Sequence, residues 1–144
     1  QFTYFQQMAG IQCKPISVEI TYGMERICMF TQKKKSVFEL IWNDEGITYS
    51  DIFYQSEKEF SKYNFEMADT KNLFTIFGIF EKEAKNLLEN NLPMPAYDQS
   101  LKASHVFNIL DARGAISIAQ RADFISKIRE IIKNVGQIWL KGNE

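Results

Sequence analysis

The most constraining feature of the sequence is a strand pattern that runs through a glycine directly into a helix. Side chains alternate between apolar and polar over residues 16–22, which predicts a β-strand. Gly23 follows, and residues 24–33 then carry a helical pattern with Glu25 and Arg26 at its start. This order predicts a fixed cation at a strand-to-helix junction, beside a glycine that lets a flat ligand approach the backbone.

The patterns on either side of this junction predict an α+β protein. Residues 1–8 predict a first strand and the sequence around Gly10 a turn, so that two antiparallel strands lead into the helix. Residues 36–49 predict a connector with a turn at 43–46, and apolar side chains recur at three and four from about residue 50 onward. We therefore predict the end of an antiparallel-sheet core over 1–35, the connector over 36–49, and a mostly α-helical C-terminal domain over 50–144.

Capping residues and prolines divide the second half into four predicted helices. Ser50 or Asp51 is expected to cap a helix running towards residue 63, and Asp69 or Thr70 a long helix through residue 88. Two prolines, at 93 and 95, are expected to separate that helix from a third, which carries residues 97–110 and ends near residue 114. Ser117 is expected to cap the last helix, through residue 139.

Composition excludes several classes of protein. The 144 residues can form one domain with a real core, and a net charge of -1 gives no general signal for binding a polyanion. No apolar run reaches 18 residues, so no membrane span is predicted and a cytoplasmic location is expected. With one histidine and two cysteines 15 residues apart, no metal site is predicted within the chain.

Polar side chains on the two predicted strands form a candidate ligand site. Strand alternation puts Glu19, Thr21 and Gly23 on one face, where a carboxylate and a hydroxyl could hold an ammonium group. Gln1 and Thr3 share a face of the first strand and would need polar partners, of which a ligand would be one. A solvent-exposed strand edge with an incidental glutamate explains the pattern as well.

The charged residues after the glycine also allow two explanations each. The guanidinium of Arg26 can stack on a purine and still donate to phosphate oxygens, or it can be an ordinary surface side chain. Glu25 can contact a ligand, orient Arg26 or favour the helix N-terminus. The run Lys33 to Lys35 can offset the helix dipole or contact RNA phosphates, and the single histidine, His105, is expected to be half-buried on its helix.

Several longer motifs carry a resemblance to a known family. They are Gln-Phe-Thr-Tyr-Phe-Gln-Gln at 1–7, Glu-Ile-Thr-Tyr-Gly-Met-Glu-Arg at 19–26, Tyr-Asn-Phe-Glu at 63–66, Lys-Ala-Ser-His-Val-Phe-Asn at 102–108 and Leu-Asp-Ala-Arg-Gly-Ala-Ile-Ser at 110–117. In this order they resemble the C-terminal half of the alpha subunit of the bacterial α2β2 glycyl-tRNA synthetase, a class II aminoacyl-tRNA synthetase. The strand, the Gly-x-Glu-Arg turn and the helix resemble the third signature motif of class II enzymes.

The resemblance implies a role for each candidate residue. Arg26 would be the catalytic residue that packs against adenine and reaches the ATP phosphates, with Gly23, Glu25 and Gln1 also in the ATP site. Glu19 would hold the ammonium group of glycine, with Thr21, Gln1 and Thr3 in the same pocket. ATP and Mg²⁺ are implied as cofactors, with the metal-binding glutamate expected three residues before Gln1.

The resemblance also implies a reaction and partners. The family activates glycine with ATP to glycyl-adenylate and pyrophosphate and transfers glycine to tRNA(Gly), as an alpha homodimer that joins a larger beta subunit. Motifs 1 and 2 of class II enzymes are not found in residues 1–144, so we expect the chain to be a fragment that is inactive alone. The alternative is a non-catalytic helical binding or assembly module of synthetase ancestry. The joint presence of four residues argues against it: Glu19, Thr21, Gly23 and Arg26.

Overall fold

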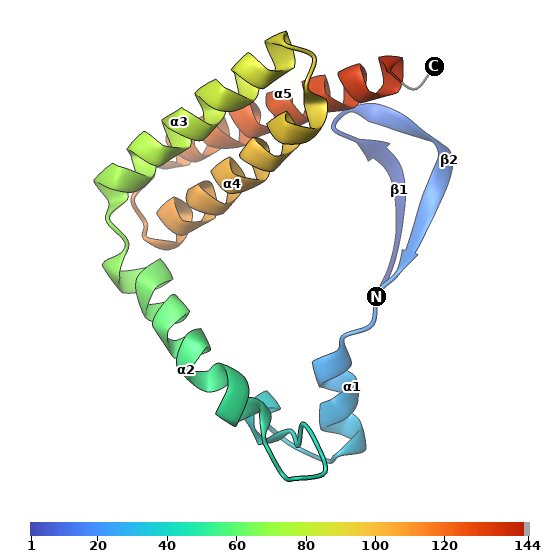
Figure 1. Cartoon of the computed structure of the whole chain (residues 1–144), viewed down its shortest axis with the longest axis vertical. Helices are drawn as coiled ribbons and strands as arrows, with labels where there is room; N and C mark the ends of the chain where they lie inside the picture. The colour runs from blue at the N-terminus through green and yellow to red at the C-terminus, as the bar shows by residue number, and fades with distance from the viewer. Residues whose placement is uncertain (143–144) are drawn as a thin grey trace. The chain divides into compact units, whose positions relative to one another are not determined.

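The computed structural model describes residues 1–142 and has an α+β architecture (Figure 1). In chain order the elements are β1 (Phe2–Met8), β2 (Ile11–Ile20), α1 (Met24–Thr31), a 3₁₀ turn (Val37–Glu39), α2 (Tyr49–Lys62), a π turn (Tyr63–Met67), α3 (Thr70–Glu89), α4 (Pro93–Ala112) and α5 (Ile118–Lys141). The two strands form one two-stranded sheet, and they are antiparallel because a two-residue turn joins them. The predicted fold class is therefore confirmed as α+β, with two strands and five α-helices among the described residues.

The hairpin differs from the prediction in its second strand. That strand was expected to begin at residue 16, after Pro15, but β2 begins at Ile11 and runs through the proline. A strand at a sheet edge tolerates proline, because the missing N–H costs no ladder hydrogen bond on the open side. Ala9 and Gly10 both have positive φ, of 50° and 79°, which is the backbone of a two-residue type I′ turn and confirms the turn predicted there.

Two compact units are distinguished by their internal contacts, and each is described by itself. The first comprises residues 1–5 and 14–63, and the second comprises residues 6–13 and 64–144. This grouping follows contacts and is no test of the predicted domain boundaries, which stay a prediction.

The second unit is built on three long helices that pack along one another, α3, α4 and α5 (Figure 1). Their core contains Leu73, Phe77, Leu110 and Phe124, where the rings of Phe77 and Phe124 meet edge-on at 4.3 Å between centroids. Ala84, Ala96, Ile131 and Val135 form a second buried cluster. The predicted helical periodicity is thus confirmed as a buried stripe on α3, α4 and α5, whereas α2 has no fully buried residue.

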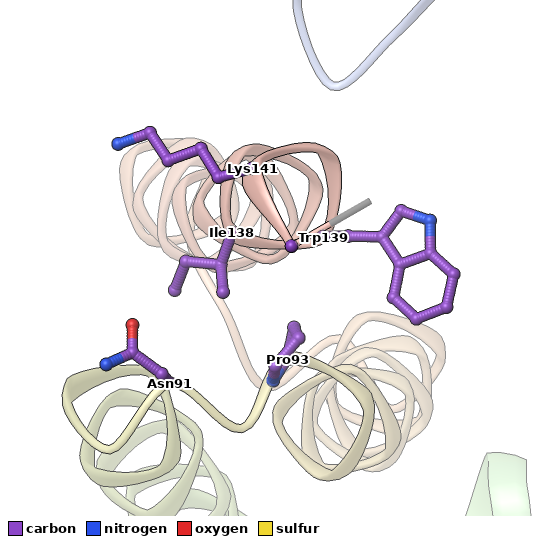
Figure 2. Close-up of a pocket in the computed structure, with 6 residues that line it drawn as sticks. Asn91, Pro93, Ile138, Trp139 and Lys141 are labelled. Atoms are coloured by element: carbon purple, nitrogen blue, oxygen red, sulfur yellow. The ribbon is translucent and has the colours of Figure 1, made fainter. Parts of the chain in front are cut away.

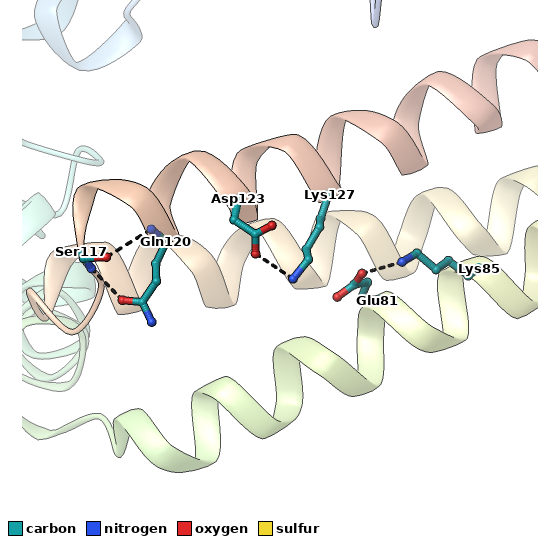
Figure 3. A network of polar contacts seen from close by, with 6 residues as sticks. All are labelled: Glu81, Lys85, Ser117, Gln120, Asp123 and Lys127. Atoms are coloured by element: carbon teal, nitrogen blue, oxygen red, sulfur yellow. Dashed lines mark hydrogen bonds and ion pairs between the residues drawn. The ribbon is translucent and has the colours of Figure 1, made fainter.

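Local capping sets where these helices begin. Ser117 caps α5, as predicted, with a reciprocal pair of bonds to Gln120 (Figure 3). Asp69, one of the two caps predicted there, caps α3. Further along, Lys127 bonds Asp123 at 2.8 Å; this hydrogen bond, helped by the charge of Glu81, raises the pKa of Lys127. These polar contacts lie on the α3 and α5 surfaces over the core.

Three predictions about the helices were wrong. The cap of α2 is Thr48, which exchanges bonds with Asp51 in a capping box and lowers the pKa of that carboxyl, instead of Ser50 or Asp51. The prolines do not precede the third helix but lie in its first turn, where a missing N–H costs nothing. His105 is exposed rather than half-buried, because the buried stripe of α4 runs through Ala103, Val106, Phe107 and Leu110.

The first unit has almost no buried core. Within residues 1–5 and 14–63, Leu40 alone is fully buried, at 5% exposure. Beside it a cluster of aromatic rings joins the 3₁₀ turn to α2: Phe38, Trp42, Tyr49, Phe53 and Tyr54. An antiparallel bridge from Ile41 to Thr48 closes the connector around the turn predicted at 43–46, which ends at Gly46 with a φ of 83°. The apolar face of the hairpin remains exposed.

Candidate active site

The open end of the hairpin gathers the polar residues predicted for the ligand site. The amino nitrogen of Gln1 donates to the carbonyl of Thr21 at 2.9 Å, and the N–H of Thr21 donates to the carbonyl of Gln1 at 2.9 Å. Two residues that exchange both bonds lie directly opposite each other in an antiparallel ladder. Two steps further along the ladder from this pair, Thr3 lies opposite Glu19, so all four polar side chains occupy one face.

The register in which the two strands pair, and not only the alternation of side chains along each strand, brings these four residues to one face. Counting outward from the two-residue turn at Ala9 and Gly10 would place Gln1 opposite Val18, on the apolar face. The observed partner is Thr21, three residues further along, which matches the lengths of the strands: seven residues in β1 and ten in β2. The three extra residues of β2 shift the register, so that Gln1 and Thr3 lie on the face of Glu19 and Thr21.

A hydrogen bond within this polar face joins the two residues predicted to bind an ammonium group. The hydroxyl of Thr21 donates to Oε1 of Glu19, with both side chains exposed. The bond fixes the carboxylate while leaving its second oxygen for another donor. Phe2, Tyr4, Val18, Ile20 and Tyr22 lie on the opposite, apolar face and are 55–69% exposed.

Gly23 is the N-cap of α1, and two residues, Thr21 and Tyr22, separate it from the end of β2 at Ile20. Its φ of -82° and ψ of 92° are open to any residue, so the backbone conformation does not require glycine there. A Cβ on Gly23 would lie 3.7–3.8 Å from the side-chain carbons of Arg26, which is ordinary contact. The backbone conformation therefore does not explain the glycine, and the expected close approach of a flat ligand at Gly23 stays a prediction.

Arg26 and Glu25 lie in the first turn of α1 and are exposed. A cation at a helix N-terminus is opposed by the helix dipole, and Gly23 provides no side-chain cap for the first N–H groups. The cation and the glycine cap each make the helix less stable, yet each favours the binding of an anion at the helix N-terminus. Among the described residues Arg26 forms no ion pair, so the guanidinium is available, and no bond joins it to Glu25.

This arrangement can be compared with known proteins. The family model of the glycyl-tRNA synthetase alpha subunit matches residues 1–144. The chain belongs to the glycyl-tRNA synthetase alpha subunit family. Membership confirms the resemblance drawn from the sequence motifs and supports a role as a glycine–tRNA ligase, with a beta subunit and tRNA as partners in general terms.

Two hollows of the second unit are lined by none of the residues predicted for glycine or ATP. One of about 520 Å³ lies between the start of α4 and the end of α5, lined by Asn91, Pro93, Ile138, Trp139 and Lys141 (Figure 2). Over residues 1–142 the structure has no cluster of three acidic, histidine or cysteine side chains suited to a metal ion, and no helix long and apolar enough to cross a membrane.

The geometry at Gly23 leads to a prediction that separates ligand binding from folding. Gly23→Ala should change the melting temperature little, because its φ is ordinary and the added Cβ has room; at an N-cap the cost stays within about 1 kcal/mol. We expect the KM for ATP to rise at least tenfold, because the methyl group would take up space beside Gly23, where the resemblance drawn from the sequence places adenine. Thermal melting and ATP titration of pyrophosphate exchange measure the two effects. An unchanged KM would mean that no ligand approaches this glycine.

Proposed function

We propose that this chain provides the glycine site and the third-motif part of the ATP site of a glycine–tRNA ligase with a class II catalytic core. The observation that carries the proposal is the family match over residues 1–144, which includes the strand, the Gly-x-Glu-Arg turn and the helix. The polar hairpin face and the exposed guanidinium at the start of α1 support the assignment of individual residues.

Glycine offers only an ammonium group and a carboxylate for recognition. In our proposal Glu19 accepts a hydrogen bond from the ammonium group, and Thr21 holds that carboxylate in position through the bond it already donates. Gln1 and Thr3 face these residues across the ladder and offer further polar contacts to the amino acid, and Gln1 also to the nucleotide. A site for glycine needs no pocket for a side chain. Larger amino acids are therefore excluded, because their side chains have no room.

ATP is proposed to bind at the junction of β2 and α1. The guanidinium of Arg26 stacks on adenine and donates to phosphate oxygens, Gly23 leaves room for the base, and Glu25 lies beside the nucleotide. An oxygen of the glycine carboxylate attacks the α-phosphorus as the bond to the pyrophosphate leaving group breaks. The resulting glycyl-adenylate is then attacked by a terminal ribose hydroxyl of tRNA(Gly), which loses its proton as AMP leaves.

Mg²⁺ is expected to accompany ATP, bound mainly through its phosphates. The described residues do not offer a carboxylate cluster that fits the ion, so no step is assigned to a metal held by these residues. The electrostatic contribution from this chain is therefore the cation of Arg26 and the free N–H groups of α1.

Assembly is proposed to follow the family in detail: an alpha homodimer joined to the beta subunit in an α2β2 complex in the cytoplasm. The first unit has one fully buried residue and a row of exposed apolar side chains, so it gains little stability from its own core. We also propose that residues 1–144 alone are inactive, because motifs 1 and 2 of class II enzymes are not found among them, so activity is measured on the alpha subunit assembled with its beta subunit.

Glycine-dependent ATP–pyrophosphate exchange tests the proposed function directly. The parent alpha subunit, assembled with the beta subunit, should exchange pyrophosphate into ATP with glycine and not with alanine or serine. Residues 1–144 alone, assayed under the same conditions, should show no exchange. An intact, folded complex without glycine-dependent exchange would favour the non-catalytic assembly module.

A further inference from the structure

A lysine cluster, Lys33–Lys35, follows α1 on a rigid turn. The N–H of Lys34 donates to the carbonyl of Met29 at 2.9 Å, and the N–H of Lys33 to that of Phe30 at 3.2 Å. This pair of bonds is the Schellman motif, in which the residue after the cap adopts a left-handed conformation and is usually glycine. Here that residue is Lys33, with a φ of 53°. A lysine therefore occupies a position where glycine would fit with less strain.

A side-chain clamp holds the far end of the same loop. Gln32 accepts from the N–H of Ile41 at 2.8 Å and donates to the carbonyl of Ile41 at 3.0 Å. Ser36 accepts from the N–H of Phe38 and starts the 3₁₀ turn. The loop between residues 32 and 41 is thus pinned at both ends, so the backbone that carries the lysine cluster is ordered before any partner binds.

The charge around the lysine cluster is unbalanced. Arg26 and the three lysines lie between Glu25 and Glu39, so residues 25–39 carry four positive and two negative charges in a chain of net charge -1. No ion pair involves any of the three lysines within residues 1–142. The helix dipole alone does not account for three adjacent cations, since its effect falls off within one turn.

We propose that the lysine cluster binds backbone phosphates of the tRNA substrate. The inference rests on the proposed function, in which tRNA must reach the adenylate at the opposite end of α1. That helix has eight residues and spans about 12 Å, so the cluster and Arg26 lie within the reach of a few nucleotides of one strand. Lysine acts as a point charge on phosphate, so the contacts secure RNA without reading its sequence.

Binding of tRNA(Gly) transcript across a salt series tests the proposal on the assembled alpha–beta complex. Replacing Lys33, Lys34 and Lys35 by alanine should raise the Kd at least tenfold near 0.15 M salt. It should also reduce the slope of log Kd against log salt by about 2, as expected for the loss of three phosphate contacts. The matched control replaces Lys71, Lys82 and Lys133, three exposed lysines of the second unit without ion pairs in the described chain, and should leave both values unchanged.

A second variant separates binding from folding. Lys33→Gly removes one cation and relieves the left-handed conformation, so its melting temperature should not fall while its Kd for tRNA rises two- to fivefold. An unchanged Kd and salt slope in the triple variant, or an equal change in the control, overturns the proposal. Weakened alpha–beta assembly with unchanged tRNA affinity overturns it too and indicates a protein contact.

Glycine-dependent exchange needs no tRNA and is measured on the same variants. It should stay within twofold of the parent in the lysine variants. Absence of exchange in the parent itself would contradict the proposed function, whereas the tRNA measurements would still report on the lysine cluster. The two failures are therefore distinguishable.

Discussion

Replacing Arg26 with alanine should lower glycine-dependent ATP–pyrophosphate exchange by about 10²–10³-fold, the range for removing one positioned donor from a site of developing charge. The guanidinium lies in the first turn of α1, where its charge opposes the helix dipole and finds no ion pair among the described residues. Its removal should therefore leave the helix intact or slightly favour it. A loss of exchange with an unchanged melting temperature would assign the effect to chemistry or ATP binding.

The conservative variant sharpens this prediction. Arg26→Lys keeps the charge but loses the planar fork that stacks on a base and donates twice, so it should recover only part of the activity. Arg129→Ala, at an exposed position of α5, serves as the matched control and should behave like the parent. Exchange at parental rates in Arg26→Ala would contradict the assignment of this residue to the ATP site.

The second large effect is expected at Glu19. Glu19→Gln keeps the size of the side chain and removes its charge, and it should raise the KM for glycine by about 10–100-fold, because a hydrogen bond to a charged group contributes about 1.5–3 kcal/mol. The KM for ATP should change less than threefold, which distinguishes this residue from Arg26. Glycine titrations of exchange at saturating ATP provide the measurement.

A smaller effect in the same direction is expected at Thr21. Thr21→Val removes the hydroxyl that donates to Glu19 and should raise the KM for glycine by about fivefold, since a neutral positioning bond contributes about 1 kcal/mol. Glu57→Gln, an exposed glutamate on α2, is the control. Equal glycine KM values in the parent and in Glu19→Gln would remove the carboxylate from the glycine site.

The helices of the second unit were predictable because their signals are local. A cap such as Ser117 bonds a residue three positions away, and the buried stripes repeat every three or four residues. Both patterns can therefore be recognised from a short stretch of sequence. The errors were local too: Thr48 and the two prolines obey capping rules that were applied two to four residues out of place.

Contacts between distant residues were not predictable in this way. Arg113 is the C-cap residue of α4, and its guanidinium donates to the carbonyls of Phe65, at 2.8 Å, and Ala68, at 3.3 Å. These partners are 48 and 45 residues away, and they hold the π turn and the start of α3 against the end of α4. No periodicity or cap marks such a bond, since the arginine could equally point into solvent.

The sequence by itself determined the family, the strand–glycine–helix junction and the identity of the candidate residues, because these depend on residue types and spacing over a few positions. Only the tertiary structure decided which face of the first strand lies beside which face of the second. Gln1 pairs with Thr21 instead of Val18, and a shift of three residues in a strand of period two exchanges its faces. That register results from backbone pairing between strands, which side-chain alternation within one strand does not specify.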